Sequence, residues 1–489
     1  MRDIPTAQVL KRIQAENVWW REPHTINESY LSLQRRAYFE LLFPLVTYLD
    51  VRRAVLLMGP RRVGKTVLLH HVIQQLIADG IAPSNICYVS VDHPIHNNCS
   101  LHDLHEHSLS ASPTGVPGPR YVFFDEIQYM RDWEVQLKTL VDHATGTRFV
   151  ASGSAAAALR LKSNESGAGR FTDFLLPPLT FHEYLALLGK EEQLLPREAQ
   201  ARVFLPSLDA DAPVFVPYDI EALNRSFVHY LNFGGYPEAI LSKAIQDDPA
   251  RFIKGDIIDK VLLRDLPGLY GIQDIQELNY LFTTLAFNSA REVSLEQLAK
   301  SSGVAKNTIR RYIEYLEAAF LVKVVHRIDR SGRRFQRANY FKVYLMNPSI
   351  RCALFSPLES TDEEMGNLAE TGILSQWFHA SANLHYARWA NGEVDLVGLD
   401  QKLKPGWAVE VKWSDRYRER PRDLRSLLAF CRVNHLDRAL VTTRSTFDSI
   451  ELGGTTLEFV PASVYCYTVG LNSIRRRSAS PTGWATPYG

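Results

Sequence analysis

Cysteine is scarce in this chain of 489 residues, and no two cysteines stand in a C-x-x-C spacing. The five that are present are scattered along the sequence, at Cys87, Cys99, Cys352, Cys431 and Cys466. An odd, dispersed set argues against a disulfide framework and against a zinc site, and it fits a reducing compartment.

Long apolar runs and an excess of one charge are also missing. No stretch approaches the roughly twenty apolar residues that cross a membrane, and the N-terminus has no apolar run of signal-peptide length. The formal net charge of +1 gives no global argument for binding nucleic acid or a membrane, so any such binding must come from local patches. We expect a soluble, cytoplasmic protein without a membrane partner.

The most informative segment is Val55 to Thr66, a buried strand that runs into the pattern G-x-x-x-x-G-K-T. Its two glycines let the loop curl so that backbone N–H groups converge on phosphate oxygens. Lys65 would bind the β- and γ-phosphates, and the Thr66 hydroxyl is placed for Mg²⁺. A glycine-rich turn is the alternative, but the strand–loop–helix order favours an ATP site. The expected nucleotide-binding residues are Gly59, Pro60, Arg61, Arg62, Val63, Gly64, Lys65, Thr66 and Val67.

A second element of this site is the apolar strand from Tyr121, which ends in the adjacent carboxylates Asp125 and Glu126. Ligands collect at the carboxyl ends of parallel strands. Asp125 would hold Mg²⁺, and Glu126 would polarise the attacking water as a general base. The next strand ends in small hydroxyl residues, and Ser152 or Ser154 would either sense the γ-phosphate or only cap the strand.

Alternation of strands and helices predicts an α/β fold, with an additional-strand P-loop NTPase sandwich followed by other modules. Within the sandwich, the region between the second strand and Asp125, about residues 93–119, reads as short and loop-like. The predicted division is 1–45 N-terminal helical arm, 46–190 ATPase core, 191–290 helical lid, 291–350 winged helix-turn-helix, 351–472 C-terminal α/β domain and 473–489 flexible tail.

The helix-turn-helix prediction rests on a capped helix over 294–300, a turn at Gly303 and a second helix over 304–320. The second helix exposes polar and basic residues suited to phosphates and base edges. The hairpin-like stretch Val322–Tyr344 would be a basic wing, with Arg327, Arg330, Arg333, Arg334 and Arg337. Such a module contacts DNA or serves only for protein packing, and the sequence does not decide between them.

The C-terminal third holds a second constellation of charged residues. One strand carries Asp395, a neighbouring strand carries Glu410 and Lys412 on one face, and a preceding helix offers Glu370. Carboxylates that hold Mg²⁺ or Mn²⁺ beside a lysine are what a metal-dependent phosphodiesterase requires. The same side chains can instead form buried salt bridges. Five arginines follow Lys412 in the sequence, and they would either line a nucleic-acid backbone or form a solvated helix face. These are Arg416, Arg418, Arg420, Arg422 and Arg425.

Together these motifs resemble a bacterial and archaeal family that joins an AAA-type ATPase domain to a C-terminal domain of unknown function, itself similar to the PD-(D/E)XK nuclease fold. The resemblance covers nearly the full length. It rests on GPRRVGKT (59–66), FFDEIQ (123–128), SGS (152–154), GRF (169–171), LLPPLTFHEYL (175–185), FGGYPEA (233–239), EVDLV (393–397) and EVK (410–412).

The resemblance implies that Arg170 lies where an arginine finger or sensor approaches the γ-phosphate. It also implies an Mg²⁺-dependent ATPase, a STAND-like switch or motor, whose nuclease-like domain acts on nucleic acid, DNA in preference to RNA. A role in defence or in mobile elements, and a homo-oligomer, would fit it. The alternative is an ATPase whose nuclease-like domain is inactive and binds DNA or protein.

Overall fold

The computed structural model describes residues 5–22, 30, 32–113, 116–153, 169–201, 203–206, 214–335, 339–380 and 382–479. The chain divides into two compact units, Met1–Pro177 and Pro178–Gly489. Ser154 and Arg337, which the sequence assigns to the nucleotide site and to the wing, lie outside the described residues. Within the ranges given above, no helix is long and apolar enough to span a membrane.

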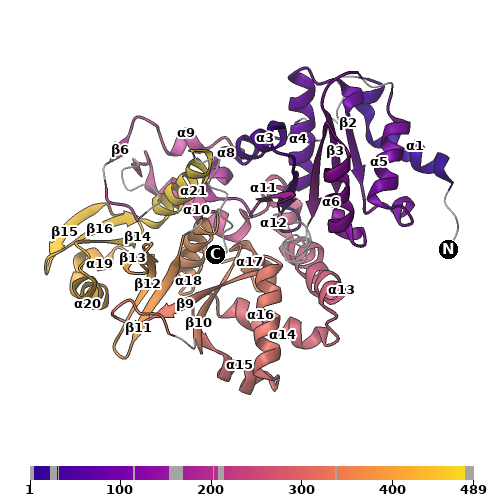
Figure 1. Ribbon diagram of the computed structural model, residues 1–489. Helices are drawn as coiled ribbons and strands as arrows, with labels where there is room; N and C mark the ends of the chain where they lie inside the picture. Colours follow the sequence, from indigo (N-terminus) through magenta and orange to yellow (C-terminus); the bar gives the residue numbers. More distant parts are fainter. Residues whose placement is uncertain are drawn as a thin grey trace. The chain divides into compact units, whose positions relative to one another are not determined.

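The first unit, coloured indigo to purple in Figure 1, is built on a five-stranded parallel sheet with the order β2-β3-β4-β1-β5. The predicted α/β fold class is confirmed here, and β1 is buried along its whole length, as a central parallel strand requires. The sequence did not predict β5. The strands are β1 (Ala54–Met58), β2 (Ile86–Ser90), β3 (Arg120–Asp125), β4 (Thr147–Gly153) and β5 (Phe171–Leu175).

The helices of this unit include the predicted N-terminal arm. Two neighbouring tryptophans hold it to the sheet, because the indole N–H groups of Trp19 and Trp20 both donate to the carbonyl of Ile86, at 3.0 and 2.8 Å. The α-helices are α1 (Thr6–Glu16), α3 (Phe39–Thr47), α4 (Lys65–Ala78), α5 (Leu101–Ala111) and α6 (Trp133–His143). Single turns of 3₁₀ helix are η1 (Val18–Trp20), η2 (Pro83–Asn85), η3 (Pro94–His96) and η4 (Ile127–Tyr129).

Helix α5 corrects the expectation of a loop over residues 93–119. It begins at a capping box in which the Ser100 hydroxyl accepts from the backbone N–H of Asp103, and the Asp103 carboxylate accepts from the N–H of Ser100. Each partner satisfies an N–H that the first helical turn leaves open. The Ser-x-x-Asp spacing was the sequence signal for this helix.

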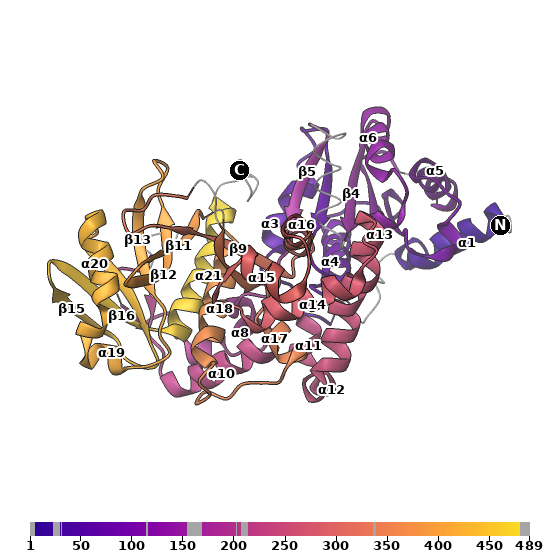
Figure 2. The same ribbon diagram turned by 90° about the horizontal axis from the view of Figure 1, so that it is seen from below.

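The second unit contains one mixed sheet of nine strands, in the order β15-β16-β14-β13-β12-β11-β9-β10-β8. The wing strands β9 and β10 do not stand apart as a separate hairpin, because β9 also pairs in parallel with β11, with His326 opposite His385 (Figure 2). The strands are β8 (Glu292–Ser294), β9 (Val322–Ile328), β10 (Tyr340–Leu345), β11 (Leu384–Trp389), β12 (Gly392–Leu399), β13 (Pro405–Glu410), β14 (Arg438–Thr443), β15 (Asp448–Leu452) and β16 (Thr455–Pro461).

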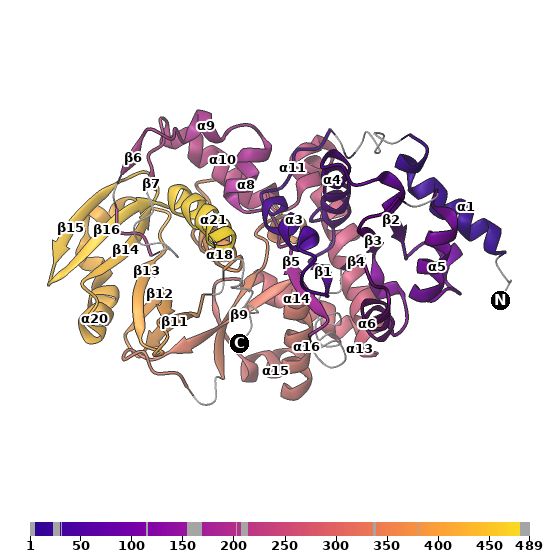
Figure 3. The ribbon, with the colours of Figure 1, turned by 45° about the horizontal axis from the view of Figure 1, so that its top comes forward.

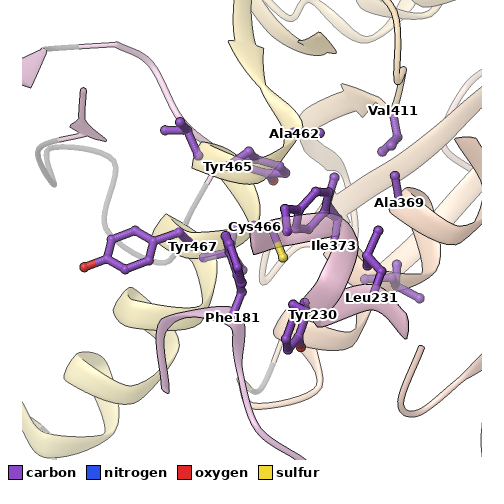
Figure 4. Close-up of a cluster of buried hydrophobic side chains, with 14 of the residues drawn as sticks. Phe181, Tyr230, Leu231, Ala369, Ile373, Val411, Ala462, Tyr465, Cys466 and Tyr467 are labelled. Atoms are coloured by element: carbon purple, nitrogen blue, oxygen red, sulfur yellow. The ribbon is translucent and has the colours of Figure 1, made fainter. Parts of the chain in front are cut away.

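Helices cover both faces of this sheet. Figure 3 shows α20 (Arg425–Asn434) on one face and α18 (Met365–Trp377) with α21 (Ala462–Ala479) on the other, each packed on its own apolar cluster. Because α21 continues to Ala479, the predicted flexible tail is wrong for residues 473–479. Figure 4 shows the larger cluster, in which Ala369 of α18 lies near Val411, just beyond the end of β13.

The remaining helices of the second unit precede or flank the sheet. α15 (Leu295–Ser302) and α16 (Lys306–Ala318) are joined at Gly303, whose φ of 73° is left-handed, a conformation that glycine adopts without strain. The others are α8 (Phe181–Leu187), α9 (Glu191–Leu194), α10 (Ile220–Phe233), α11 (Pro237–Leu241), α12 (Lys243–Asp247), the π-helical Ala250–Asp259 and Val261–Asp265, α13 (Leu266–Tyr270), α14 (Ile275–Phe287), α17 (Ser349–Leu354), α19 (Arg416–Glu419) and the 3₁₀ turn η7 (Pro421–Leu424). A two-stranded ribbon pairs β6 (Gln200–Ala201) with β7 (Val214–Phe215).

Candidate functional site

The loop between β1 and α4 has the geometry of a phosphate-binding loop. A Cβ added to Gly59 would lie 2.2 Å from the carbonyl oxygen of Leu176, so no larger residue fits there. Gly64 is left-handed, with a φ of 92°, and directly precedes the first turn of α4. The Nζ atom of Lys65 donates to the carbonyls of Gly59, at 3.0 Å, and Pro60, at 2.7 Å. The loop therefore wraps around its own lysine at a helix N-terminus, where anions are favoured.

Asp125, at the carboxyl end of β3, is the centre of a hydrogen-bond network. Its Oδ2 accepts from the hydroxyl of Thr66 at 2.7 Å and from the phenol of Tyr88 at 2.7 Å. Its Oδ1 accepts from the hydroxyl of Ser152 and from the backbone N–H of Glu126, the latter at 3.2 Å. Four donors hold one buried carboxylate, so its orientation is fixed beside the start of α4.

Tyr88 of β2 is a member of this network that the sequence analysis missed. Burial and the charge of Asp125 raise the pKa of its phenol, so it stays a hydrogen-bond donor. The ring of Tyr88 packs against His70 of α4, with 4.7 Å between the ring centroids. The His70 ring also stacks on that of Tyr30, with 4.3 Å between the centroids. Burial lowers the pKa of His70 to about 4, and the imidazole is therefore neutral near pH 7.

Glu126 stands directly after β3 in a left-handed conformation, with a φ of 56°. Non-glycine residues seldom adopt this conformation, and it occurs where the surrounding structure enforces it. Its carboxylate accepts a hydrogen bond of 2.5 Å from the side-chain amide of Gln128, a second residue that the sequence analysis did not assign. Ser152 is fully buried, and its hydroxyl donates to the Asp125 carboxylate. Ser152 therefore helps to orient Asp125.

Arg170 lies at the opposite end of the sheet from this loop. Its carbonyl accepts from the N–H of Ala54, the first residue of β1, and its guanidinium pairs with Asp142 at 2.5 Å. The phosphate loop begins five residues further along β1, roughly 16 Å away at the usual rise of a strand. The expected role as a sensor of the γ-phosphate in its own chain does not fit this position, and only a finger directed at another copy stays as a prediction.

The residues at the loop fit Mg²⁺. The Thr66 hydroxyl and the Asp125 carboxylate are oxygen ligands of the kind this ion prefers, and they lie within hydrogen-bond distance of each other. These are the two residues that the sequence predicted for the metal bound with ATP.

The carboxylates predicted in the C-terminal third also come together, in the second unit. Asp395 of β12, Glu410 at the end of β13 and Glu370 of α18 line one open cavity of about 670 Å³, with Lys412 beside them. Lys412 bridges the first two, with its Nζ 3.2 Å from Oδ2 of Asp395 and 2.8 Å from Oε1 of Glu410. The backbone N–H of Val411 donates to Asp395 at 2.9 Å, which fixes the two strands to each other at this point.

A second lysine, which the sequence analysis missed, lies at the centre of this cluster. Lys342 of β10 has its Nζ 3.0 Å from Oε1 of Glu370, 2.9 Å from Oε1 of Glu393 and 3.6 Å from Oδ1 of Asp395. Its side chain is 3% exposed, whereas that of Lys412 is 22% exposed. The phenol of Tyr344, also on β10, donates to Glu370 at 2.6 Å.

Burial and charge act in opposite directions on these groups. Burial raises the pKa of Glu370 to about 7 and that of Glu410 to about 7, although the lysines oppose the shift. Burial also disfavours the ionised form of Asp395, but Lys412 and Lys342 outweigh it and hold the pKa of Asp395 below its ordinary value. Burial disfavours the charged form of Lys342, yet Glu370 and the other anions raise its pKa well above the ordinary value.

This arrangement does not fit the predicted second metal. Among the described residues, no three His, Cys, Asp or Glu side chains are placed to hold an ion together. The predicted ligands Glu370 and Asp395 instead face the ammonium group of Lys342, and Asp395 and Glu410 face that of Lys412. A divalent ion bound between these oxygens would lie beside one or two unscreened positive charges, which is unfavourable at such depth.

Comparison with protein families places an AAA domain on residues 51–185, which include the loop, Asp125 and Glu126. A second family model, described as a domain of unknown function, matches residues 224–362. The chain thus carries an AAA-type P-loop domain followed by a conserved domain of unknown function, as the resemblance implies. The similarity to the nuclease fold stays a prediction.

Curated relatives are similar to this chain at low identity. An uncharacterized protein of Methanocaldococcus jannaschii is 24% identical over 345 residues, which are 69% of this chain and 70% of the relative. A second one from the same organism is 26% identical over 304 residues, which are 60% of this chain and 62% of the relative. An uncharacterized protein of Haemophilus influenzae is 22% identical over 317 residues, 63% of this chain and 70% of the relative.

Two solved structures resemble the chain loosely. The Aeropyrum pernix ORC1 protein, solved in complex with DNA, aligns with a TM-score of 0.32 and 14% identity over 69% of this chain and 95% of that one. The replication initiator DnaA, bound to AMPPCP and single-stranded DNA, aligns with a TM-score of 0.27 and 13% identity over 57% of this chain and 87% of that one.

Proposed function

We propose that the first unit binds ATP with Mg²⁺ and hydrolyses it. The observation that carries this proposal is the hydrogen bond of 2.7 Å between Thr66 and Asp125 at the mouth of the Lys65 loop, with Glu126 as the next residue. Lys65 would bind the β- and γ-phosphates, and the N-terminus of α4 would favour the same charge. Glu126 would orient a water molecule and accept its proton as that water attacks the γ-phosphorus and the bond to the β-phosphate oxygen breaks. Bound Mg²⁺ supplies neutralisation of phosphate charge.

Phosphate release from ATP by the purified protein tests this proposal. Release should require Mg²⁺ and should stop when EDTA is added in excess. Release that continues at the same rate in EDTA, or no release under any condition, would count against the proposal. The same assay with a nucleoside triphosphate other than ATP measures the preference for the base.

We further propose that the second unit binds nucleic acid, DNA in preference to RNA, and that this domain acts as a binding module. Helix α16 presents Arg310 and Arg311 to solvent on the face opposite its buried residues. The arginines that follow β13 are exposed as well, and Arg416 lines the cavity beside Lys412. The lysines paired with Glu370, Asp395 and Glu410 favour a binding module over a metal-dependent nuclease.

Fluorescence anisotropy with duplex DNA and duplex RNA at several salt concentrations tests this second proposal. The double variant R310A/R311A and the double variant R420A/R422A separate helix α16 from the arginines after β13. Each lost phosphate contact should weaken binding and lower the dependence on salt. The exposed Arg131 of the first unit provides a control, because Arg131→Ala should leave binding unchanged. Equal affinity in all variants would remove both surfaces from the proposal.

Cleavage of nucleic acid is a second candidate for this unit. It is favoured by the one observation that Asp395, Glu410 and Lys412 lie together in an open cavity next to exposed arginines. Incubation of DNA and RNA with the protein in Mg²⁺ or Mn²⁺ distinguishes the two functions. Binding without nicking supports the module, whereas nicking that Asp395→Ala abolishes, with ATP hydrolysis intact, supports the nuclease.

A further inference from the structure

We propose that Lys342 is a built-in cation of the C-terminal cluster, which occupies the place where a divalent metal would otherwise bind. The role of this lysine does not depend on ATP hydrolysis in the first unit. It also joins two modules, because Lys342 lies on β10, a wing strand, while its partners lie on α18 and β12.

The enclosure of Lys342 distinguishes it from Lys412. The Lys412 side chain is 22% exposed, so its ammonium group can turn toward solvent or toward a phosphate. The Lys342 side chain is 3% exposed, and its Nζ is surrounded by three carboxylates and lies 5.5 Å from the centre of the Tyr386 ring. Withdrawing it would leave buried carboxylates without a counter-charge, which is strongly destabilising. Lys342 is therefore a permanent part of the site.

The charges of the cluster lead to the same conclusion. Glu370, Asp395 and Glu410 carry three negative charges when ionised, and Lys342 and Lys412 carry two positive charges, so the sum is −1. Glu393 has a further partner in Arg388, at 2.7 Å. Without Lys342 the same five positions would sum to −2, which a divalent ion neutralises. The lysine thus supplies charge that a metal would supply, and its removal should create a metal site.

Manganese binding to the full-length protein without nucleotide tests this inference, measured by calorimetry and by the loss of the free Mn²⁺ signal in electron paramagnetic resonance. The variant Lys342→Met keeps much of the side-chain length and removes the charge. It should bind one more Mn²⁺ per chain than wild type, at least tenfold more tightly than any Mn²⁺ held there by wild type. The double variant K342M/D395N should lose this ion. Lys323→Met is the matched control, since Lys323 lies on the neighbouring strand β9 and is paired with Glu317 of α16, and this variant should gain no Mn²⁺.

Two results would overturn the inference. One is a correctly folded K342M protein that gains no Mn²⁺. The other is a wild-type protein that already holds Mn²⁺ in this cluster, shown by an ion that disappears in D395N. If K342M does not fold, the comparison of wild type with D395N decides alone. Equal Mn²⁺ binding by the two proteins supports a built-in lysine cation, whereas an ion that wild type binds and D395N does not bind contradicts it. Neither result depends on whether the protein hydrolyses ATP or binds DNA.

Discussion

The phenol of Tyr88 donates a hydrogen bond of 2.7 Å to Oδ2 of Asp125, the same oxygen that accepts from Thr66. Tyr88 lies on β2 and Asp125 on β3, which pair in parallel with Ser90 opposite Asp125. The tyrosine thus orients the carboxylate from the strand beside it. Partners of this kind commonly change metal affinity by one to two orders of magnitude when they are lost.

Tyr88→Phe should therefore raise the Mg²⁺ concentration needed for half-maximal ATP hydrolysis, by roughly tenfold. Turnover at saturating Mg²⁺ should change much less, because the phenol acts through its hydrogen bond to Asp125. Tyr121→Phe is the control, since Tyr121 is buried near the other end of β3. A Tyr88→Phe protein with an unchanged Mg²⁺ dependence would show that Thr66 and Ser152 orient Asp125 without help.

Lys65→Ala should abolish tight ATP binding. Lys65 is 5% exposed, and no second lysine is present between residues 59 and 66 to replace it. Calorimetry with ATP and Mg²⁺ measures the loss, and the exposed Lys11 of α1 supplies a control variant, Lys11→Ala, that should bind as wild type does. Undiminished affinity in Lys65→Ala would place the nucleotide elsewhere.

Gly59→Ala should destabilise the first unit more than Gly80→Ala does. The Cβ at position 59 would meet a backbone oxygen at 2.2 Å, which cannot move without shifting the end of β5. Gly80 has a φ of 90° and open space around its Cβ, so its substitution costs only the left-handed strain, roughly 1–2 kcal/mol. Thermal unfolding of both variants measures the difference, and equal melting temperatures would contradict the close approach of the loop to Leu176.

Arg170→Ala should leave ATP hydrolysis within about twofold of wild type, because Arg170 is paired with Asp142 at the amino end of the sheet. Asp142→Asn removes the same pair and should behave alike. A large loss of turnover in Arg170→Ala but not in Asp142→Asn, with the loss becoming greater as the protein concentration rises, would contradict this expectation. It would reveal a finger directed at a nucleotide in another copy.

The sequence was sufficient to predict which residues meet at the proposed nucleotide site where these residues are close in the chain or follow a strand. Gly59 to Thr66 and Asp125 were predictable because a strand–loop–helix unit and a second apolar strand place them at one sheet edge. Tyr88 was not predictable, because a tyrosine within an apolar strand has the same pattern whether its hydroxyl meets a carboxylate or another partner.

The C-terminal cluster shows the same limit more clearly. The alternation of Glu410 and Lys412, together with Asp395, predicted that these side chains meet, and they do. Lys342 stands 53 residues before Asp395 in a segment that reads as a separate wing. Only the pairing of β9 with β11, which makes one sheet of both modules, places it among the carboxylates.

Single-turnover hydrolysis by Glu126→Gln tests the central claim most directly. The amide keeps the shape of the side chain and its contact with Gln128 but cannot accept a proton from water. We expect ATP and Mg²⁺ to bind with wild-type affinity while hydrolysis slows by roughly a hundredfold or more. The exposed Glu106 of α5 provides the matched control, Glu106→Gln, which should hydrolyse ATP normally. Wild-type turnover in Glu126→Gln would contradict the proposed role of this carboxylate at the phosphate loop.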